Sequence, residues 1–154
     1  MMHSLLLAAL SATILSAASV AIAQTPAGYD AELARSLGAE DNGMRRYVLV
    51  ILKSGPNKVP AGPERDEMFK GHFANMKRLS AEGKLAVAGP LDGVEGRRGI
   101  FIFAVTEIEE AKALVATDPV IIKGEMVAEF HKHYGSAALM LVRTTHDRLV
   151  KKPM

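Results

Sequence analysis

Two stretches of the chain are apolar at nearly every position and are rich in β-branched or aromatic residues. They lie within residues 46–53 and 100–105. A half-buried strand alternates apolar and polar residues, whereas these two runs are apolar on both alternating faces. The pattern therefore predicts two strands in a sheet that is covered on both sides.

Two other segments repeat their apolar residues at helical spacing. The first runs from Arg65 to Gly83 and carries Met68, Phe69, Phe73, Met76 and Leu79. This spacing predicts a helix with one apolar face. A second helix is predicted to begin after Thr106, where Glu109 completes a capping box, and to run through Val115, with Asp118-Pro119 closing it.

Two weaker strands complete the pattern. One covers residues 84–88 and is broken by Gly89-Pro90, and the other alternates over residues 126–134. The glycine-rich stretch at 93–99 follows no strand-to-helix turn, so it is interpreted as a flexible hairpin connection and not as a phosphate loop. The order β-α-β-β-α-β predicts a ferredoxin-like α+β domain, in which two helices cover one face of a four-stranded antiparallel sheet.

Two helices can cover only one face of such a sheet, so the second apolar face needs a further partner. A second copy of the chain is the simplest one, with the open faces of two sheets meeting in a homodimer. An uncovered face would exceed the apolar patch that soluble monomers usually tolerate. The apolar run 137–142 is the one segment able to replace a second copy by folding back across that face.

The first 23 residues differ in kind from the rest. No charged side chain interrupts residues 4–23, and Ala21-Ile22-Ala23 before Gln24 has the small side chains that signal peptidase accepts. We expect a signal peptide over 1–23, cleavage before Gln24, and export to the periplasm or outside the cell. The alternative is an uncleaved anchor. Its short apolar length and its Ser and Thr content argue against stable membrane insertion.

The remaining chain divides into three parts. A polar arm at 24–44 contains one helical turn, Asp30 to Leu37, which Gly38 ends as a left-handed cap. The predicted domain covers 45–134, and a C-terminal extension covers 135–154. The minimal domain requires neither the arm nor the extension, and either one could cover or reshape a pocket.

Composition excludes several classes of function. The chain has 19 Lys and Arg against 17 Asp and Glu, a net charge of +2, and only five Phe and three Tyr. Because these charges are interspersed, a nucleic-acid surface is not expected, and Arg148, Lys151 and Lys152 are interpreted as a solvated tail. The absence of cysteine excludes disulfide support and thiol chemistry.

His72 and Asp118 are the first candidates for chemistry. His72 lies on the apolar stripe of the first predicted helix, so its ring is expected to point toward the sheet. This position suits a hydrogen-bonded core histidine as well as a catalytic one. Asp118 is expected at a helix C-terminus, where the helix dipole disfavours a carboxylate, although Asp-Pro is also a common helix stop.

A second group of candidates consists of Glu129, His131 and His133, which alternate on one face of the last strand. Side chains in this pattern could converge on a metal such as zinc. The alternative is a polar strand face at a pocket or at a dimer seam. Because no further ligand is identifiable, we expect no metal at this face.

Three stretches of the chain resemble the YCII-related (YciI-like) family. They are residues 71–91 with His72 and Ala88-Gly89-Pro90, residues 109–113, and Thr117-Asp118-Pro119. The resemblance covers roughly residues 46–134. It implies a ferredoxin-like fold that pairs into a dimeric α/β barrel, and a His–Asp catalytic centre formed by His72 and Asp118. One relative is a dehydrochlorinase of a chlorinated hydroquinone, but most members have no established substrate.

This pair of residue types suits proton transfer. An imidazole accepts a proton near neutral pH, and a carboxylate on its other nitrogen selects the tautomer and stabilises the imidazolium. We therefore expect lyase-like or isomerase-like chemistry on a small organic molecule, without an organic cofactor. The competing hypothesis is a non-catalytic ligand-binding or assembly module on the same dimeric barrel.

Overall fold

The computed structural model describes residues 28–151, so the predicted signal peptide lies outside the described residues. The predicted β-α-β-β-α-β order is confirmed, and a short additional helix precedes the last strand. The elements are α1 (Ala31–Ser36), β1 (Met44–Ser54), α2 (Pro63–Ala81), β2 (Leu85–Pro90), η1 (Val94–Gly96), β3 (Arg97–Phe103), α3 (Ile108–Val115), α4 (Pro119–Ile122), β4 (Met126–Ser136), η2 (Ala137–Leu141) and α5 (Val142–His146).

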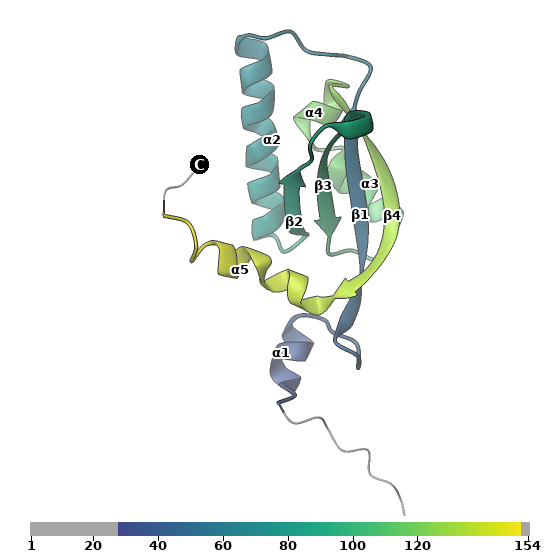
Figure 1. Cartoon of the computed structure of the whole chain (residues 1–154), viewed down its shortest axis with the longest axis vertical. Coiled ribbons are helices and arrows are strands. Elements are labelled where there is room, and N and C mark those ends of the chain that lie inside the picture. Colours follow the sequence, from purple (N-terminus) through teal and green to yellow (C-terminus); the bar gives the residue numbers. More distant parts are fainter. Residues whose placement is uncertain (1–27, 152–154) are drawn as a thin grey trace, which may run out of the picture.

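The four long strands form one antiparallel sheet in the order β2-β3-β1-β4 (Figure 1). The two doubly apolar runs are the central strands, β1 and β3, and Val50 of β1 lies opposite Phe101 of β3 and Phe130 of β4. The α+β prediction is confirmed. None of the helices in residues 28–151 combines the length and the hydrophobicity that a bilayer span needs.

One face of the sheet packs against α2, α3 and α4, and the hydrophobic core lies between these layers. Every second residue of the central strands points into it, as the strand periodicity requires. The main contributors are Val48, Val50, Phe101 and Phe103 from the sheet, and Met68, Leu79, Val115 and Val120 from the helices.

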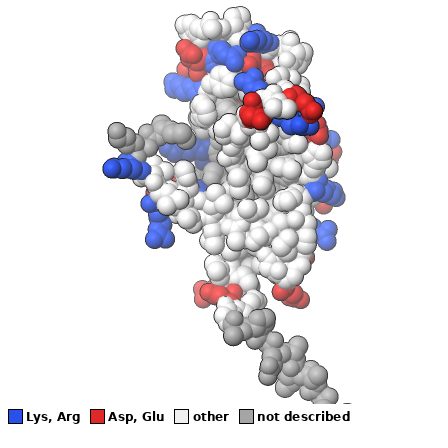
Figure 2. All heavy atoms as spheres, in the orientation of Figure 1, with Lys and Arg blue, Asp and Glu red and all other residues white. Residues whose placement is uncertain are grey.

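The opposite face of the sheet, which we call the open face, carries the other apolar set. Leu49 lies opposite Ile102, and Ile51 lies opposite Ile100. All four side chains are half-buried. Figure 2, which views this face, shows a broad region without Lys, Arg, Asp or Glu over the strands.

The C-terminal extension runs from β4 to the far edge of the sheet and contacts β2. The Tyr47 hydroxyl donates to the Ser136 carbonyl at 2.9 Å, and the Ala137 amide donates to the Gly43 carbonyl at 2.9 Å. Figure 1 shows α5 crossing at one end of the strands. The extension therefore buries Tyr47, whereas Val127 near the other end of the open face remains exposed.

Some local features of the arm and of the first helix were also predicted from sequence. The predicted helical turn forms as α1, and Gly38 has a left-handed φ of 65° as expected. The structure adds that the Asp30 side chain caps α1 through the amides of Glu32 and Leu33. Helix α2 begins at Pro63, two residues before the predicted start. Proline is well suited to a first helical turn, where its missing N–H is not needed.

Two local predictions were wrong. Strand β2 is not broken at Gly89-Pro90 but extends through Pro90, because β2 is an edge strand and proline is tolerated there. The capping box at Thr106 does not form, and the N-cap of α3 is Glu107, without a side-chain cap bond.

Candidate active site

His72 lies on the buried face of α2, one turn after Met68, and is 7% exposed. Residues four apart share one face of a helix, and here that face points at the sheet. The His72 ring centroid is 6.1 Å from that of Phe101 on β3. The predicted direction of the side chain is therefore confirmed.

Asp118 does not end a helix, contrary to the sequence prediction. Helix α3 ends at Val115 as predicted, and Asp118 is the N-cap of the next helix, α4. Its Oδ1 accepts a hydrogen bond from the Val120 amide at 3.1 Å. The carboxylate thus accepts a backbone N–H at a helix N-terminus, which favours a negative charge, and the expected conflict with a helix dipole does not arise.

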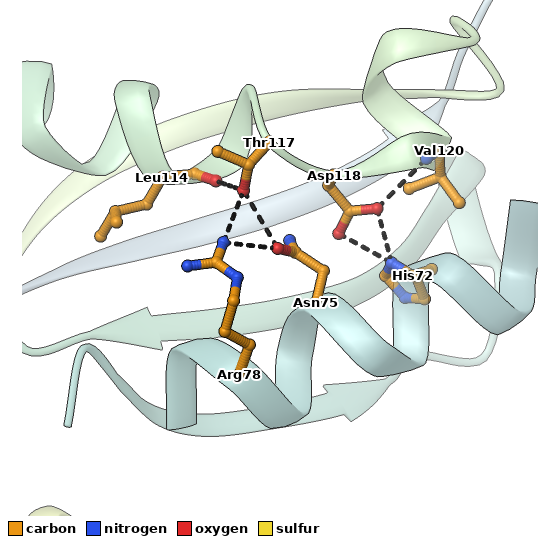
Figure 3. A network of polar contacts seen from close by, with 7 residues as sticks. All are labelled: His72, Asn75, Arg78, Leu114, Thr117, Asp118 and Val120. Atoms are coloured by element: carbon orange, nitrogen blue, oxygen red, sulfur yellow. Dashed lines mark hydrogen bonds and ion pairs between the residues drawn. The ribbon is translucent and has the colours of Figure 1, made fainter. Parts of the chain in front are cut away.

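His72 and Asp118 form a buried pair, although they are 46 residues apart in sequence. The Nδ1 atom of His72 lies 2.9 Å from Oδ1 and 2.8 Å from Oδ2 of Asp118 (Figure 3). Asp118 is 0% exposed. Because a carboxylate only accepts hydrogen bonds, Nδ1 carries the proton and Nε2 of the neutral ring keeps a lone pair.

The Nε2 atom of His72 is not sealed inside the protein. Within residues 28–151, its ring makes hydrogen bonds only through Nδ1. The one fully buried side-chain nitrogen or oxygen without a partner in that part of the chain is Nε of Arg45. Nε2 therefore keeps some contact with solvent.

Phenylalanine rings surround the His72 imidazole. The centroid of Phe69 lies at 6.1 Å in an edge arrangement, that of Phe73 at 5.4 Å, and that of Phe101 at 6.1 Å. Phe73 is more than half exposed, so this aromatic surround extends to the protein surface. Its low polarity strengthens the hydrogen bond between His72 and Asp118.

Close packing between α2 and α4 brings the pair together. A Cβ added to Gly71 would lie 2.9 Å from Cγ of Pro119, nearer than ordinary carbon contacts of about 3.5–4.0 Å. Gly71 precedes His72, and Pro119 follows Asp118. The missing side chain at Gly71 therefore lets the two segments approach to hydrogen-bonding distance.

Three polar residues next to the pair were not predicted as part of the site. Arg78 Nη2 donates to Oδ1 of Asn75 at 2.8 Å and to Oγ1 of Thr117 at 3.2 Å (Figure 3). A sequence signal for them existed. Asn75 and Arg78 follow His72 by three and six residues on the same helix, and Thr117 is the neighbour of the aspartate.

A second buried carboxylate also escaped the sequence analysis. Glu125 is 3% exposed, and its Oε1 lies 2.9 Å from Nη2 of Arg65. Its Oε2 accepts from the Val59 amide at 2.7 Å, while Nη1 of Arg65 donates to the Val59 carbonyl at 2.7 Å. The Arg65 hydrogen bond holds the pKa of Glu125 below its usual value. Arg65 also stacks over Phe69, so this pair borders the aromatic surround of His72.

The candidate metal ligands on β4 do not converge. His131 Nε2 lies 2.8 Å from Oε1 of Glu129, and this hydrogen bond lowers the pKa of Glu129. His133 instead packs near Tyr47, with ring centroids 6.1 Å apart. Within residues 28–151 no three acidic, His or Cys side chains are arranged to hold a metal. The expectation of no bound metal stays a prediction.

A surface hollow of about 390 Å³ lies away from the His–Asp pair, between the arm, β4 and the start of α3. Its acidic and basic side chains are paired, since Arg46 lies 3.7 Å from Glu40 and Lys132 lies 3.4 Å from Glu107. The Tyr134 hydroxyl also bonds Glu40 at 2.8 Å. The charges of this hollow are therefore balanced within the protein.

The domain that carries His72 and Asp118 matches a known family. The family model of the YCII-related domain covers residues 46–130, from β1 into β4, which is more than half of the 154 residues. No curated protein matches the chain. The resemblance seen in the sequence is thus confirmed, and the chain belongs to the YCII-related domain family.

Proposed function

We propose that the protein is an enzyme that transfers protons on a small organic molecule, with Nε2 of His72 as the general base. Asp118 positions the ring and stabilises its protonated form. The observation that carries this proposal is the buried pair, in which both Asp118 oxygens lie within 2.9 Å of Nδ1. A carboxylate in that place leaves Nε2 as the atom able to accept a proton.

The chemistry follows from that arrangement. Nε2 takes a proton from an acidic C–H bond, and the electron pair of that bond stays on the substrate as an enolate-like anion. The imidazolium is stabilised by Asp118. Return of the proton to a different atom completes an isomerisation. Departure of a leaving group with its electron pair from the adjacent carbon completes an elimination. Neither reaction requires an organic cofactor.

The test is hydrogen exchange on candidate substrates. Purified protein in D₂O is mixed with 1,3-diketones, keto acids and dihydroxybenzenes, and deuterium incorporation is followed by NMR. We expect protein-dependent exchange with at least one class, and a loss of about 10²- to 10⁴-fold in His72→Gln, the usual contribution of a general base. His131→Gln is the matched control, because His131 also has a carboxylate at 2.8 Å.

Two outcomes would contradict an enzymatic role. One is the absence of protein-dependent exchange with every class of compound. The other is an unchanged rate in folded His72→Gln protein, with circular dichroism used to establish that the variant is folded.

The second candidate function is a non-catalytic ligand-binding or assembly module. It is favoured by the deep burial of the pair and by the location of the hollow, which lies elsewhere on the protein. In such a module His72→Gln would change affinity or stability only. Mass spectrometry of small molecules that copurify with the wild type, together with the exchange assay, separates the two functions.

Two further parts of the proposal concern assembly and location. A second copy covers the open face, because its centre is lined by half-buried Leu49, Ile51, Ile100 and Ile102 (Figure 2). On the β4 side of this face, Glu129 and His131 lie opposite Ile51 and Leu49, so the second copy would also meet this polar pair. Light scattering at micromolar concentration tests this dimer, and a monomer mass contradicts it.

Export and cleavage before Gln24 are tested by the intact mass of secreted material. A membrane-bound species that retains residues 1–23 contradicts them.

A further inference from the structure

We infer that Arg78, Asn75 and Thr117 form a positioning cluster that holds the Asp118 carboxylate against His72. The consequence of this cluster for catalysis rests on the proposed function. The effect of the cluster on the His72–Asp118 hydrogen bond is independent of the proposed function. Exchange of the His72 Nδ1 proton measures that effect.

The hydrogen bonds of the cluster are directional. The Arg78 guanidinium has only donors, so Oδ1 of Asn75 and Oγ1 of Thr117 both accept from Nη2, at 2.8 and 3.2 Å. The Thr117 hydroxyl has one proton of its own. The carbonyl of Leu114 lies 2.7 Å from Oγ1, closer than Oδ1 of Asn75 at 3.1 Å, and is therefore the better acceptor for it. Thr117 is thus held from both α2 and α3.

The cluster bridges the same two segments as the candidate catalytic pair. Asn75 and Arg78 lie along α2 from His72, and Thr117 immediately precedes Asp118. Figure 3 shows the two polar bridges next to each other, running between α2 and the α3–α4 connection. A shift of Thr117 away from α2 would move the backbone of Asp118 with it, and so lengthen the distance to Nδ1.

The exposure of the cluster points to positioning and not to core stability. Asn75 is half-buried, whereas Thr117 and Arg78 are exposed. Nη1 of Arg78 donates to Glu82 at 2.8 Å, which orients the guanidinium. Substitutions at exposed positions rarely unfold a protein, so variants here are expected to fold.

The test measures how fast the Nδ1 proton of His72 exchanges with water. Its NMR signal is assigned by its loss in His72→Gln. In Thr117→Val, which keeps the side-chain shape, and in Arg78→Met, which keeps the aliphatic stem, we expect exchange about two- to tenfold faster, as loss of one net hydrogen bond allows. Lys123→Met is the matched control. It removes another exposed polar link between α2 and the end of α4, the 2.7 Å contact with Glu64, and we expect the wild-type rate.

Three results would overturn the inference. They are wild-type exchange rates in both cluster variants, an equal acceleration in Lys123→Met, and the absence of a resolved Nδ1 proton signal in the wild type at low temperature. Turnover assays separate this inference from the proposed function. Faster proton exchange in a protein without turnover would refute the function alone, and turnover with an insensitive Nδ1 proton would refute the cluster alone.

Discussion

Two histidine–carboxylate pairs in this protein have the same shortest separation, 2.8 Å, but lie in opposite surroundings. His72 and Asp118 come from separate helical segments and are 7% and 0% exposed. His131 and Glu129 are two residues apart on one strand, and each side chain is 47% exposed. The geometries also differ, because both Asp118 oxygens approach Nδ1 of His72, whereas one Glu129 oxygen approaches Nε2 of His131. The larger contrast lies in the medium around the two pairs.

Solvent exposure determines how strongly each pair interacts. At the surface, solvent screens the attraction and side-chain entropy opposes a fixed geometry, so such pairs contribute little to stability. In the interior, the effective dielectric constant is lower, and a carboxylate that is also an N-cap has a fixed orientation. Only the buried pair therefore holds one imidazole tautomer in place. The following predictions test this contrast, beginning with the largest expected effect.

Removing Asp118 should have the largest consequence. Asp118→Ala deletes a buried, charged hydrogen-bond partner of His72 and the cap of α4, so we expect the free energy of unfolding to fall by about 3 kcal/mol. Urea unfolding measures this loss. Glu129→Ala is the matched control and should stay close to wild type. Equal losses in the two variants would show that burial does not distinguish the pairs.

The second prediction uses pH to compare buried Glu125 with exposed Glu129. The folded pKa of Glu125 is lowered, chiefly by its hydrogen bond to Arg65. Its contribution to stability is therefore complete above the usual glutamate pKa of 4.5 and is lost as the pH falls through the lowered folded pKa. At pH 7, Glu125→Gln should lower the free energy of unfolding by about 2 kcal/mol.

This difference between wild type and Glu125→Gln should shrink as the pH is lowered below 4.5. Thermal unfolding between pH 7 and pH 3 measures it. Glu129, whose pKa is lowered by His131, provides the comparison, and its substitution by Gln should change the pH profile less, because both partners are solvated. A difference for Glu125 that grows as the pH falls would contradict the assigned direction.

The third prediction concerns the close approach that only the buried pair requires. Gly71→Ala should lower the free energy of unfolding by about 1 kcal/mol. Overpacking against Pro119 costs roughly 1–3 kcal/mol, and the better helix propensity of alanine recovers up to about 1 kcal/mol. Pro119→Ala in the same chain should relieve the clash, so a double-mutant cycle measures the coupling. Stabilisation by Gly71→Ala alone would show that the segments separate freely.

The smallest effect is expected for His131→Gln. With both side chains about half exposed, loss of the bond to Glu129 should leave the melting temperature nearly unchanged at any ionic strength. The measurement is a thermal scan at low and at high ionic strength, each at two protein concentrations. A substantial loss that depends on concentration would show that the β4 pair is buried in an assembly, and the contrast between the pairs would then hold only for the isolated chain.

The sequence predicted most of the fold because its apolar pattern is strong where the core is. The doubly apolar runs became the central strands, and the stripe on α2 placed His72 toward the sheet. Local capping signals were less reliable. Thr106 does not cap α3, whose N-cap is Glu107, and Asp118 turned out to begin a helix of only four residues.

The sequence by itself determined the order of the elements, their apolar faces and the family of the chain. It also identified His72 and Asp118 as candidate residues. Periodicity is a property of neighbours along the chain, so it can be read without coordinates. The tertiary structure alone decided which side chains meet. The 2.8 Å pair, the contact of Gly71 with Pro119 and the cluster at Thr117 all join α2 to segments about 40 or more residues later. Distances of that kind depend on how closely two helices pack, and no local pattern encodes them.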